Sequence, residues 1–319
     1  MKHFFQVVFG GLLAVGTGVF IAYAGTYLWH IVRPHIYTSS TELQTSFDTT
    51  DEQSSSIAST SQTIRYTSTE EEDIINAASQ LLPKGSDKRI TSHSYLVQDI
   101  SHDITIAEYN PDTIEPIASI TKLVTAVIAR KYIPSDTHIT ITRDIMATYG
   151  NTAQFRVGET FTANDMLYPL LMVSSNDAAE AYATSYGRTK FLQAMNDFVQ
   201  SIGAYRTYFR DPSGLSPENV STPHDLALIL KWIVQHDPEI IDITTLKSKT
   251  LRSHTFINVT HFLSWSYYAG GKNGYTTEAN RTAAQLFRLG RDNDLYAVIA
   301  LGSNIRDADM LNLLKKIEK

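Results

Sequence analysis

An uninterrupted apolar run near the N-terminus constrains this chain more than any other feature. No charged side chain occurs from Phe4 to Trp29, 26 residues that an α-helix would extend over about 39 Å. That length is enough to cross a hydrocarbon core of about 30 Å. Lys2 precedes the run, and a positive N-terminal end favours the cytoplasmic side. We therefore predict a membrane anchor over residues 1–37, with the rest of the chain outside the cytoplasm.

A cleaved signal peptide is the alternative explanation of this run. Ala22-Tyr23-Ala24 resembles a small-residue cleavage site, but the apolar stretch continues past it through Trp29. Cleavage after Ala24 stays open. Residues 38–69 that follow are dominated by serine and threonine and have few large apolar side chains, so they predict a flexible linker. Globular patterning occupies residues 70–319, which we predict to be one domain.

Composition excludes several classes of function. The chain has no cysteine, which removes thiol catalysis, disulfide scaffolds and thiolate zinc sites. Its ten histidines show no metal-binding spacing, since His254 and His261 are too far apart for one helical face. We expect no metal and no other cofactor. A net charge of -6 gives no electrostatic reason to expect nucleic acid as a partner.

Strand patterns occur at both ends of the globular part, and helical patterns lie between them. The spacing predicts one hairpin over residues 94–100 and 104–109, and a second over 282–288 and 295–302. Helices are predicted at residues 71–81, 119–132, 163–173, 177–186, 189–202 and 307–317. This order indicates an α+β domain whose terminal hairpins share one antiparallel sheet.

The first chemical motif is Ser119-Ile120-Thr121-Lys122 at the start of a predicted helix. Side chains at i and i+3 lie on one helical face, so Lys122 can reach Ser119. A lysine can take the serine proton only if its pKa is lowered, which burial or a second cation achieves. By itself the motif is weak, because serine and lysine are common in helices.

Two further polar clusters follow along the chain. Ser174-Ser175-Asn176 lies at a junction of two predicted helices, where its side chains either serve a site or simply cap a helix. The stretch Gly270 to Thr276 ends a predicted strand, and its paired glycines permit close approach of the backbone to a ligand. Lys272 would be a second cation near Lys122, although a glycine-rich turn with an exposed lysine explains the same sequence.

The order of the three motifs resembles that of the serine D-Ala-D-Ala carboxypeptidases, the low-molecular-mass penicillin-binding proteins related to serine β-lactamases. The resemblance extends from about Glu70 to the C-terminus. It includes Tyr149 to Ala153, Asp211 to Leu215, Ser221 to Ala227 and Ala300 to Ser303. It implies a fold like that of DD-peptidases and β-lactamases, an antiparallel sheet of N- and C-terminal strands with a helical region between and around it.

The resemblance also implies roles for individual residues. Ser119 would be the acylated nucleophile, Lys122 its general base and Ser174 a proton relay, with Asn176 and Lys272 placing substrate and setting the electrostatics. The substrate-binding residues would be Asn273, Gly274, Tyr275, Thr276 and Arg306, with the amides of Tyr275 and Ser119 forming an oxyanion hole. The enzyme would release D-alanine from peptidoglycan stem peptides ending in D-Ala-D-Ala, and β-lactam antibiotics would acylate the same serine.

One position departs from the family pattern. Lys272-Asn273-Gly274 stands where the family has K-T-G, and the loss of one oriented hydrogen bond would cost about 1–3 kcal/mol. A catalytically weak or inactive wall-binding relative is therefore one alternative, and an endopeptidase that cuts cross-links is another. A β-lactamase is disfavoured, because Arg210 to Leu215 contains no glutamate to activate a deacylating water.

Overall fold

The computed structural model describes residues 89–265, 267–290 and 293–317. The predicted anchor, the linker and the helix at residues 71–81 lie outside the described residues, and these predictions stay untested. Over the described ranges, none of the helices combines the length and the apolar character that a membrane crossing requires.

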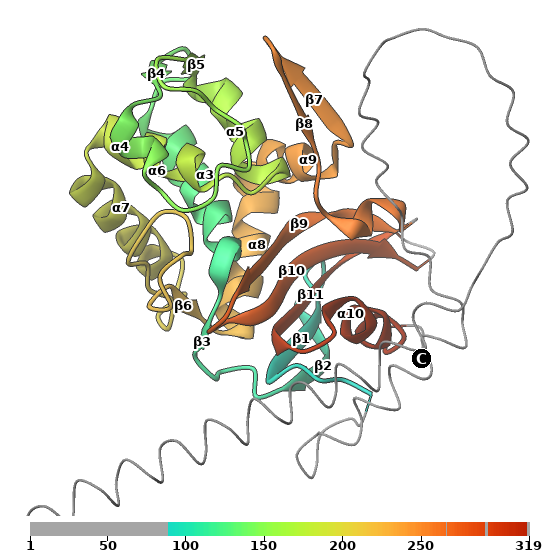
Figure 1. Cartoon of the computed structure of the whole chain (residues 1–319). Helices are drawn as coiled ribbons and strands as arrows, with labels where there is room; N and C mark the ends of the chain where they lie inside the picture. The colour runs from blue at the N-terminus through green and yellow to red at the C-terminus, as the bar shows by residue number, and fades with distance from the viewer. Residues whose placement is uncertain (1–88, 266, 291–292, 318–319) are drawn as a thin grey trace, which may run out of the picture. The chain divides into compact units, whose positions relative to one another are not determined.

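The centre of the fold is a five-stranded antiparallel sheet in the order β2-β1-β11-β10-β9 (Figure 1). Both predicted hairpins are present, and β1 pairs with β11, so strands from the two ends of the domain lie side by side as expected. β9, which carries the third motif, is an edge strand. The strands are β1 Ser94–Asp99, β2 Ile104–Tyr109, β9 Tyr268–Thr276, β10 Asn280–Leu289 and β11 Asp294–Ser303.

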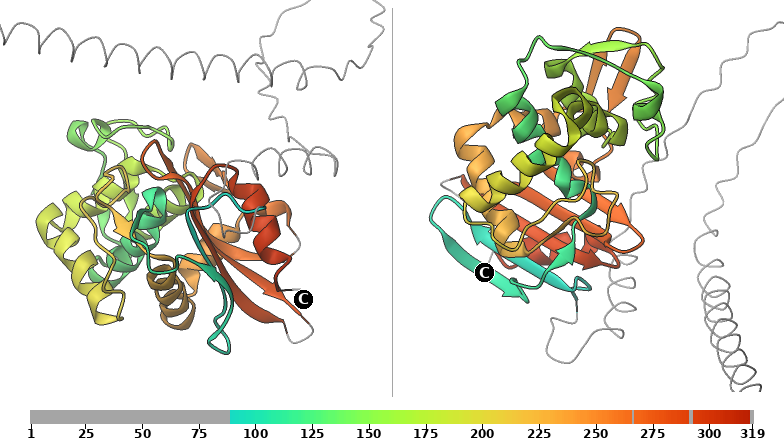
Figure 2. Two further views of the ribbon diagram at one scale, coloured as in Figure 1. Left: turned by 90° about the horizontal axis from the view of Figure 1, so that it is seen from below. Right: turned by 90° about the vertical axis from the view of Figure 1, so that its left-hand side faces the viewer.

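Both faces of this sheet are covered, which explains why β11 is apolar at every position from Leu295 to Leu301. Leu96 and its partner Ile299 belong to the core shared with the helical region. Val97 and its partner Val298 face the other way and pack with Met310 of α10 (Arg306–Leu314). Figure 2 shows α10 on one side of the sheet and the other α-helices of the described part on the opposite side.

The helical region is inserted between β2 and β9. Its predicted helices are confirmed to within a few residues, except that the segment at Ser119 begins as a 3₁₀ turn, η1 (Ala118–Thr121), before α3. Three helices, α4, α8 and α9, were not predicted, although Thr222 caps α8 and Pro223 occupies its first turn. The helices are α3 Lys122–Tyr132, α4 Arg143–Met146, α5 Ala163–Met172, α6 Asn176–Tyr186, α7 Arg188–Ser201, α8 Pro223–His236 and α9 Glu239–Thr245.

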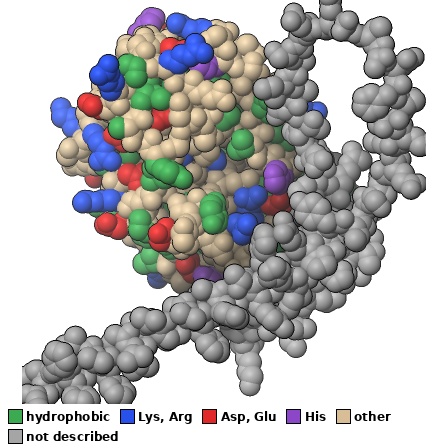
Figure 3. Space-filling model, in the orientation of Figure 1, with side chains coloured by type: hydrophobic (Ala, Val, Ile, Leu, Met, Phe, Trp, Pro, Cys, Tyr) green, Lys and Arg blue, Asp and Glu red, His purple; other side chains and the backbone are tan. Residues whose placement is uncertain are grey.

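Three two-stranded ribbons and a short 3₁₀ turn complete the described part. One ribbon, β7–β8, rises beside α5 in Figure 1. On the face in Figure 3, acidic and basic side chains are interspersed and form no field of one sign. The remaining elements are β3 Glu115–Pro116 with β6 Val220–Ser221, β4 His138–Thr140 with β5 Thr160–Thr162, β7 Ser248–Leu251 with β8 His254–Ile257, and η2 His261–Ser264.

Candidate active site

The segment that carries Ser119 is held where the helical region meets the sheet. Ala118 precedes the serine with φ of +48°, a conformation that residues other than glycine seldom adopt. Ile117 is fixed on both sides, since its N–H donates to Asn219 O and its carbonyl accepts from Thr282 Oγ1, each at 3.0 Å. The position of Ser119 is therefore set by β10 and by the loop ahead of β6.

Lys122 lies one turn after Ser119, and its side chain is fully buried. Its Nζ contacts three oxygens: Ser119 Oγ at 2.8 Å, Asn176 Oδ1 at 2.8 Å and Ser213 O at 2.6 Å. The carboxamide and backbone oxygens can only accept hydrogen bonds. A neutral amine has two N–H groups, which these two oxygens take up. Its lone pair is then left for the hydroxyl proton of Ser119.

The surroundings of Lys122 favour this neutral form. Burial lowers the pKa of Lys122 well below its ordinary value, and the positive charge of Lys272 lowers it further, against an opposing effect of the Asp211 carboxylate. Lys272 is itself 5% exposed, and burial together with the charge of Arg306 lowers its pKa to about 7. Such perturbed lysines are typical of functional sites and allow Lys122 to act as a base near neutral pH.

The loop between α7 and β6 supplies the carbonyl of Ser213. Asp211 Oδ1 accepts from the N–H groups of Ser213 and Gly214 at 2.6 and 2.8 Å, which folds the loop into a tight turn. Gly214 has φ of +88°, and a Cβ there would lie 1.9 Å from Ala118 O. Only glycine permits this turn to pack against the nucleophile segment.

The second motif separates into three side chains in different environments. Ser175 caps α6, because its Oγ accepts from Ala178 N at 3.1 Å. Ser174 is half-buried with φ of +57°, and within the described ranges its hydroxyl has no hydrogen-bond partner. Asn176 uses both ends of its carboxamide, since Nδ2 donates to Tyr149 O at 2.7 Å while Oδ1 faces Lys122. Capping therefore accounts for Ser175 alone.

β9 brings the third motif against the nucleophile segment. A Cβ on Gly274 would lie 2.8 Å from both Ser119 N and Ile117 O, so close approach requires glycine here. Lys272 Nζ donates to Asn273 O at 2.8 Å. The amide of Tyr275 follows Gly274 along the same edge strand, one residue beyond the contact with Ser119.

The other predicted substrate contacts make hydrogen bonds within the protein. Asn273 Nδ2 donates to Thr260 Oγ1 at 3.2 Å, and its Oδ1 accepts from Gln285. Thr276 Oγ1 accepts from Ala279 N at 3.1 Å in the turn before β10. Arg306 is the first residue of α10, where its Nε donates to Asp307 Oδ1 at 2.9 Å and its guanidinium lies 5.7 Å from the centre of the Phe262 ring. Their contacts with substrate stay predictions.

Backbone contributions to the site were missed from the sequence. The carbonyls of Ser213 and Tyr149 hold Lys122 and Asn176, and a backbone carbonyl has no residue-specific signal. The Asp211-Pro212-Ser213-Gly214 turn was noticed only as part of a resemblance, although its composition is typical of a turn.

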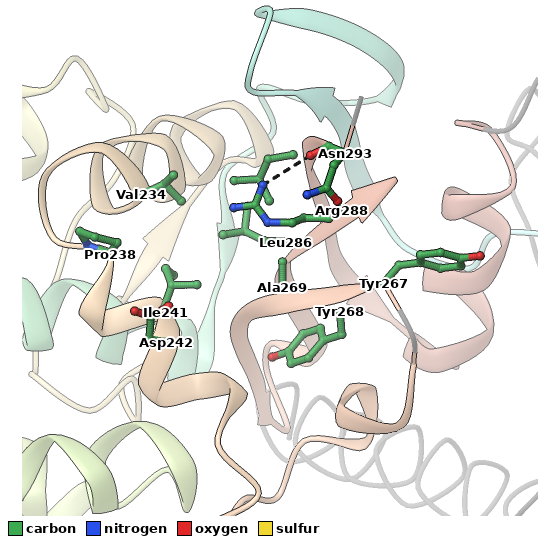
Figure 4. Close-up of a pocket in the computed structure, with 11 residues that line it drawn as sticks. Val234, Pro238, Ile241, Asp242, Tyr267, Tyr268, Ala269, Leu286, Arg288 and Asn293 are labelled. Atoms are coloured by element: carbon green, nitrogen blue, oxygen red, sulfur yellow. Dashed lines mark hydrogen bonds between the residues drawn. The ribbon is translucent and has the colours of Figure 1, made fainter. Parts of the chain in front are cut away.

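A separate cavity of about 370 Å³ lies between α8, α9 and the sheet (Figure 4). Its wall includes Val234, Ile241, Leu286 and Arg288. None of the predicted site residues lines it, so the chemistry described above lies elsewhere.

A serine hydroxyl bonded to a buried lysine of low pKa, with a second cation nearby, is the arrangement of an enzyme that acylates its own serine. The comparisons with known proteins agree. The family model for D-alanyl-D-alanine carboxypeptidases matches residues 80–291, and the chain belongs to this family of serine peptidases. The carboxypeptidase function predicted from the motifs is thereby confirmed at the level of the family.

Individual relatives span most of the domain. A D-alanyl-D-alanine endopeptidase of Pseudomonas aeruginosa is 32% identical over 245 residues, 72% of this chain and 78% of that protein. A D-alanyl-D-alanine carboxypeptidase of Mycobacterium tuberculosis is 29% identical over 221 residues, 66% of this chain and 73% of the other. The crystal structure of a D-alanyl-D-alanine carboxypeptidase from Mycobacterium tuberculosis matches with a TM-score of 0.65 at 24% identity, covering 73% of this chain and 93% of that one. This likeness confirms the predicted α+β fold.

Proposed function

We propose that Ser119 is the nucleophile and Lys122 the general base of a D-alanine-releasing enzyme that acts on peptidoglycan stem peptides. The observation that carries this proposal is the environment of Lys122 Nζ, whose two carbonyl acceptors leave the lone pair of a neutral amine for Ser119. Because the pKa of Lys122 is lowered by burial and by Lys272, that neutral form is accessible near neutral pH.

The reaction would proceed through an acyl-enzyme. Ser119 Oγ attacks the carbonyl of the penultimate D-alanine as Lys122 takes the hydroxyl proton, and the amides of Ser119 and Tyr275 hold the oxyanion. The unpartnered hydroxyl of Ser174 relays the proton to the leaving D-alanine amine. Water then hydrolyses the ester, with Lys122 again acting as the base. Penicillins would acylate the same serine.

Positive charge would draw the free carboxylate of the stem peptide into place. Lys272 and Arg306 lie close enough for the charge of Arg306 to lower the pKa of Lys272. A carboxylate held between these cations would place the last peptide bond over Ser119. The uncharged run at residues 4–29 would anchor the enzyme in the cytoplasmic membrane, with the peptidase domain outside the cytoplasm.

Cleavage of cross-linked stems is a second candidate, favoured by a specific observation. Asn273, which replaces the family threonine, uses its carboxamide on Thr260 and Gln285, and Arg306 is bonded to Asp307. A site that grips a terminal carboxylate less firmly accepts a leaving group without one. The relative from Pseudomonas aeruginosa is named an endopeptidase.

Intact-mass measurement on the full chain in detergent tests both candidates. Wild type, Ser119→Ala and a control variant, Ser135→Ala at an exposed loop position, are each treated with penicillin, a D-Ala-D-Ala pentapeptide and a cross-linked stem dimer. We expect a penicillin adduct and D-alanine release from wild type and control, and neither from Ser119→Ala. Dimer cleavage without D-alanine release would favour the endopeptidase. An adduct that survives in Ser119→Ala refutes the proposed nucleophile.

A further inference from the structure

The turn that carries Tyr149 is linked to the proposed base, Lys122, through Asn176, yet the Tyr149 side chain lies in solvent. Tyr149 O accepts from Asn176 Nδ2 at 2.7 Å, and Asn176 Oδ1 accepts from Lys122 Nζ at 2.8 Å. The side chain is 82% exposed, the highest value among the exposed large hydrophobic side chains of the described ranges. An exposed tyrosine alone needs no explanation. Three successive hydrogen bonds connect the backbone carbonyl of this tyrosine to Ser119 Oγ, so its backbone lies near the proposed reaction.

The loop around Tyr149 is held without help from its ring. Asn151 Oδ1 accepts from Phe155 N at 3.0 Å, and Asn151 Nδ2 donates to Phe155 O at 3.2 Å. Phe155 is 2% exposed and lies 5.0 Å from Phe161, centre to centre. At the end of the loop, Glu159 pairs with His254 of β8 at 3.0 Å. These contacts fix the backbone of the loop. The backbone that carries the Tyr149 ring therefore has little freedom to move.

A second exposed tyrosine borders the nucleophile from the sheet. Tyr275 is 63% exposed and follows Gly274, the residue that packs against Ser119 N. The guanidinium of Arg281 lies 5.7 Å from the centre of the Tyr275 ring. Two exposed tyrosines are thus attached to segments that border Ser119, one in the helical region and one on β9, and the Tyr275 ring already has a neighbour in the protein.

We propose that Tyr149 is a specificity-determining residue that covers an aliphatic side chain of the acyl donor, on the N-terminal side of the scissile bond. This inference rests on the proposed function. The cations Lys272 and Arg306 attract the C-terminal carboxylate, so the rest of the stem extends away from them. Successive residues of an extended peptide are about 3.3–3.6 Å apart, which puts the residue before D-Ala-D-Ala within roughly 7–10 Å of Ser119. The backbone of Tyr149 is bonded to Asn176, itself bonded to Lys122, and the exposed Tyr149 ring is the aromatic group that we assign to that region.

A pair of tripeptides that differ in one side chain tests the inference. Diacetyl-L-lysyl-D-alanyl-D-alanine and acetyl-glycyl-D-alanyl-D-alanine present the same scissile bond with and without the aliphatic group. Using the full chain in detergent, we expect Tyr149→Ala to lower kcat/KM on the lysyl substrate by about five- to tenfold, mainly through KM, and to leave the glycyl substrate within about twofold. Tyr149→Phe should retain the preference of wild type. Tyr205→Ala, which removes an exposed tyrosine after α7, is the matched control and should leave both substrates unchanged.

The outcomes separate this inference from the proposed function. Penicillin adduct formation is measured first in every variant. No adduct with wild type defeats the proposed function itself. With adducts present, an equal loss on both tripeptides in Tyr149→Ala would assign the residue a purely structural role and overturn the inference. Unchanged kinetics in that variant, or a wild type that does not prefer the lysyl substrate, would overturn it as well.

Discussion

Gly274 is where a single added methyl group should damage catalysis most directly. Its backbone lies in an ordinary extended strand, so alanine would be tolerated there by conformation alone. The difficulty is space. A Cβ would lie 2.8 Å from Ser119 N, 2.8 Å from Ile117 O and 2.5 Å from Thr282 Oγ1. The Thr282 hydroxyl can rotate away only by breaking its hydrogen bond to Ile117 O, and the two backbone atoms belong to the segment that positions the proposed nucleophile.

The size of the effect follows from these distances. Ordinary contacts of a Cβ begin near 3.4 Å, so β9 and the nucleophile segment must separate by about 0.6 Å. Oxyanion-hole donors act over a window of about 2.7–3.1 Å, which a shift of that size exceeds. The loss of one such donor typically costs about 10²–10³ in rate. We therefore expect Gly274→Ala to acylate with penicillin about a hundredfold more slowly than wild type.

The assay is the second-order rate constant for acylation by a fluorescent penicillin, with thermal unfolding measured on the same samples. Gly203→Ala is the matched control, because Gly203 has φ of +87° and nothing lies within 4 Å of a Cβ built there. That change should cost about 1 kcal/mol of stability through backbone strain and leave acylation within about twofold. If folded Gly274→Ala acylates within about threefold of the wild-type rate, the claim that close packing of β9 on Ser119 is needed for acylation is wrong.

Two further predictions concern charge. Lys272→Gln removes the cation that lowers the pKa of Lys122, so the acid limb of the pH profile of penicillin acylation should move to higher pH. The rate loss should be largest below about pH 7, where Lys272 is charged. An acid limb that does not move between pH 5 and 9 would contradict this coupling. Asp177 is fully buried without a hydrogen-bond partner for either carboxylate oxygen in the described residues, and burial raises its pKa from 3.8 to about 6. The folded protein therefore keeps this proton longer than the unfolded chain, and stability falls as pH rises from about 4 to 6 by an order of 1–3 kcal/mol. Asp177→Asn should raise the unfolding temperature at pH 8 but not at pH 4, and an equal change at both would refute the ionisation argument.

Local patterns were sufficient for the parts of the fold that local physics determines. Each of the two hairpins joins two strand-like stretches across turn residues, Ser101 to Asp103 in the first and Gly290 and Asn293 in the second, and both formed as predicted. Ser119 and Lys122 were expected to meet because residues three apart share a face, and their side chains are 2.8 Å apart. The missed α8 did have a local signal, since Thr222 caps the helix ahead of Pro223. These two residues were quoted only as part of the family resemblance and were not interpreted as the start of a helix.

Other features depend on residues that are distant in sequence. The short ribbons have strands of two to four residues, too few for an alternating pattern to be distinguished. The predicted contact of Asn273 with substrate stays a prediction, and the partners of its amide, Thr260 and Gln285, lie 13 and 12 residues away. The partner of Lys122 in the loop, Ser213, lies 91 residues along the chain. Only the folded structure brings these groups together.

The strained residues show why the site itself is the hardest part to predict. Ala118 and Ser174 have φ of +48° and +57°, and each belongs to one of the motif segments around Lys122. Such a conformation costs on the order of 1–2 kcal/mol per residue, so local preference opposes the arrangement that places the two serines. The contacts that hold these strained conformations come from other segments of the chain. Gly214 packs on Ala118 O, and Asn176, at the junction of α5 and α6, is bonded to Lys122. Sequence patterns identify the reactive residues by type, whereas their placement is imposed against local preference by the rest of the domain.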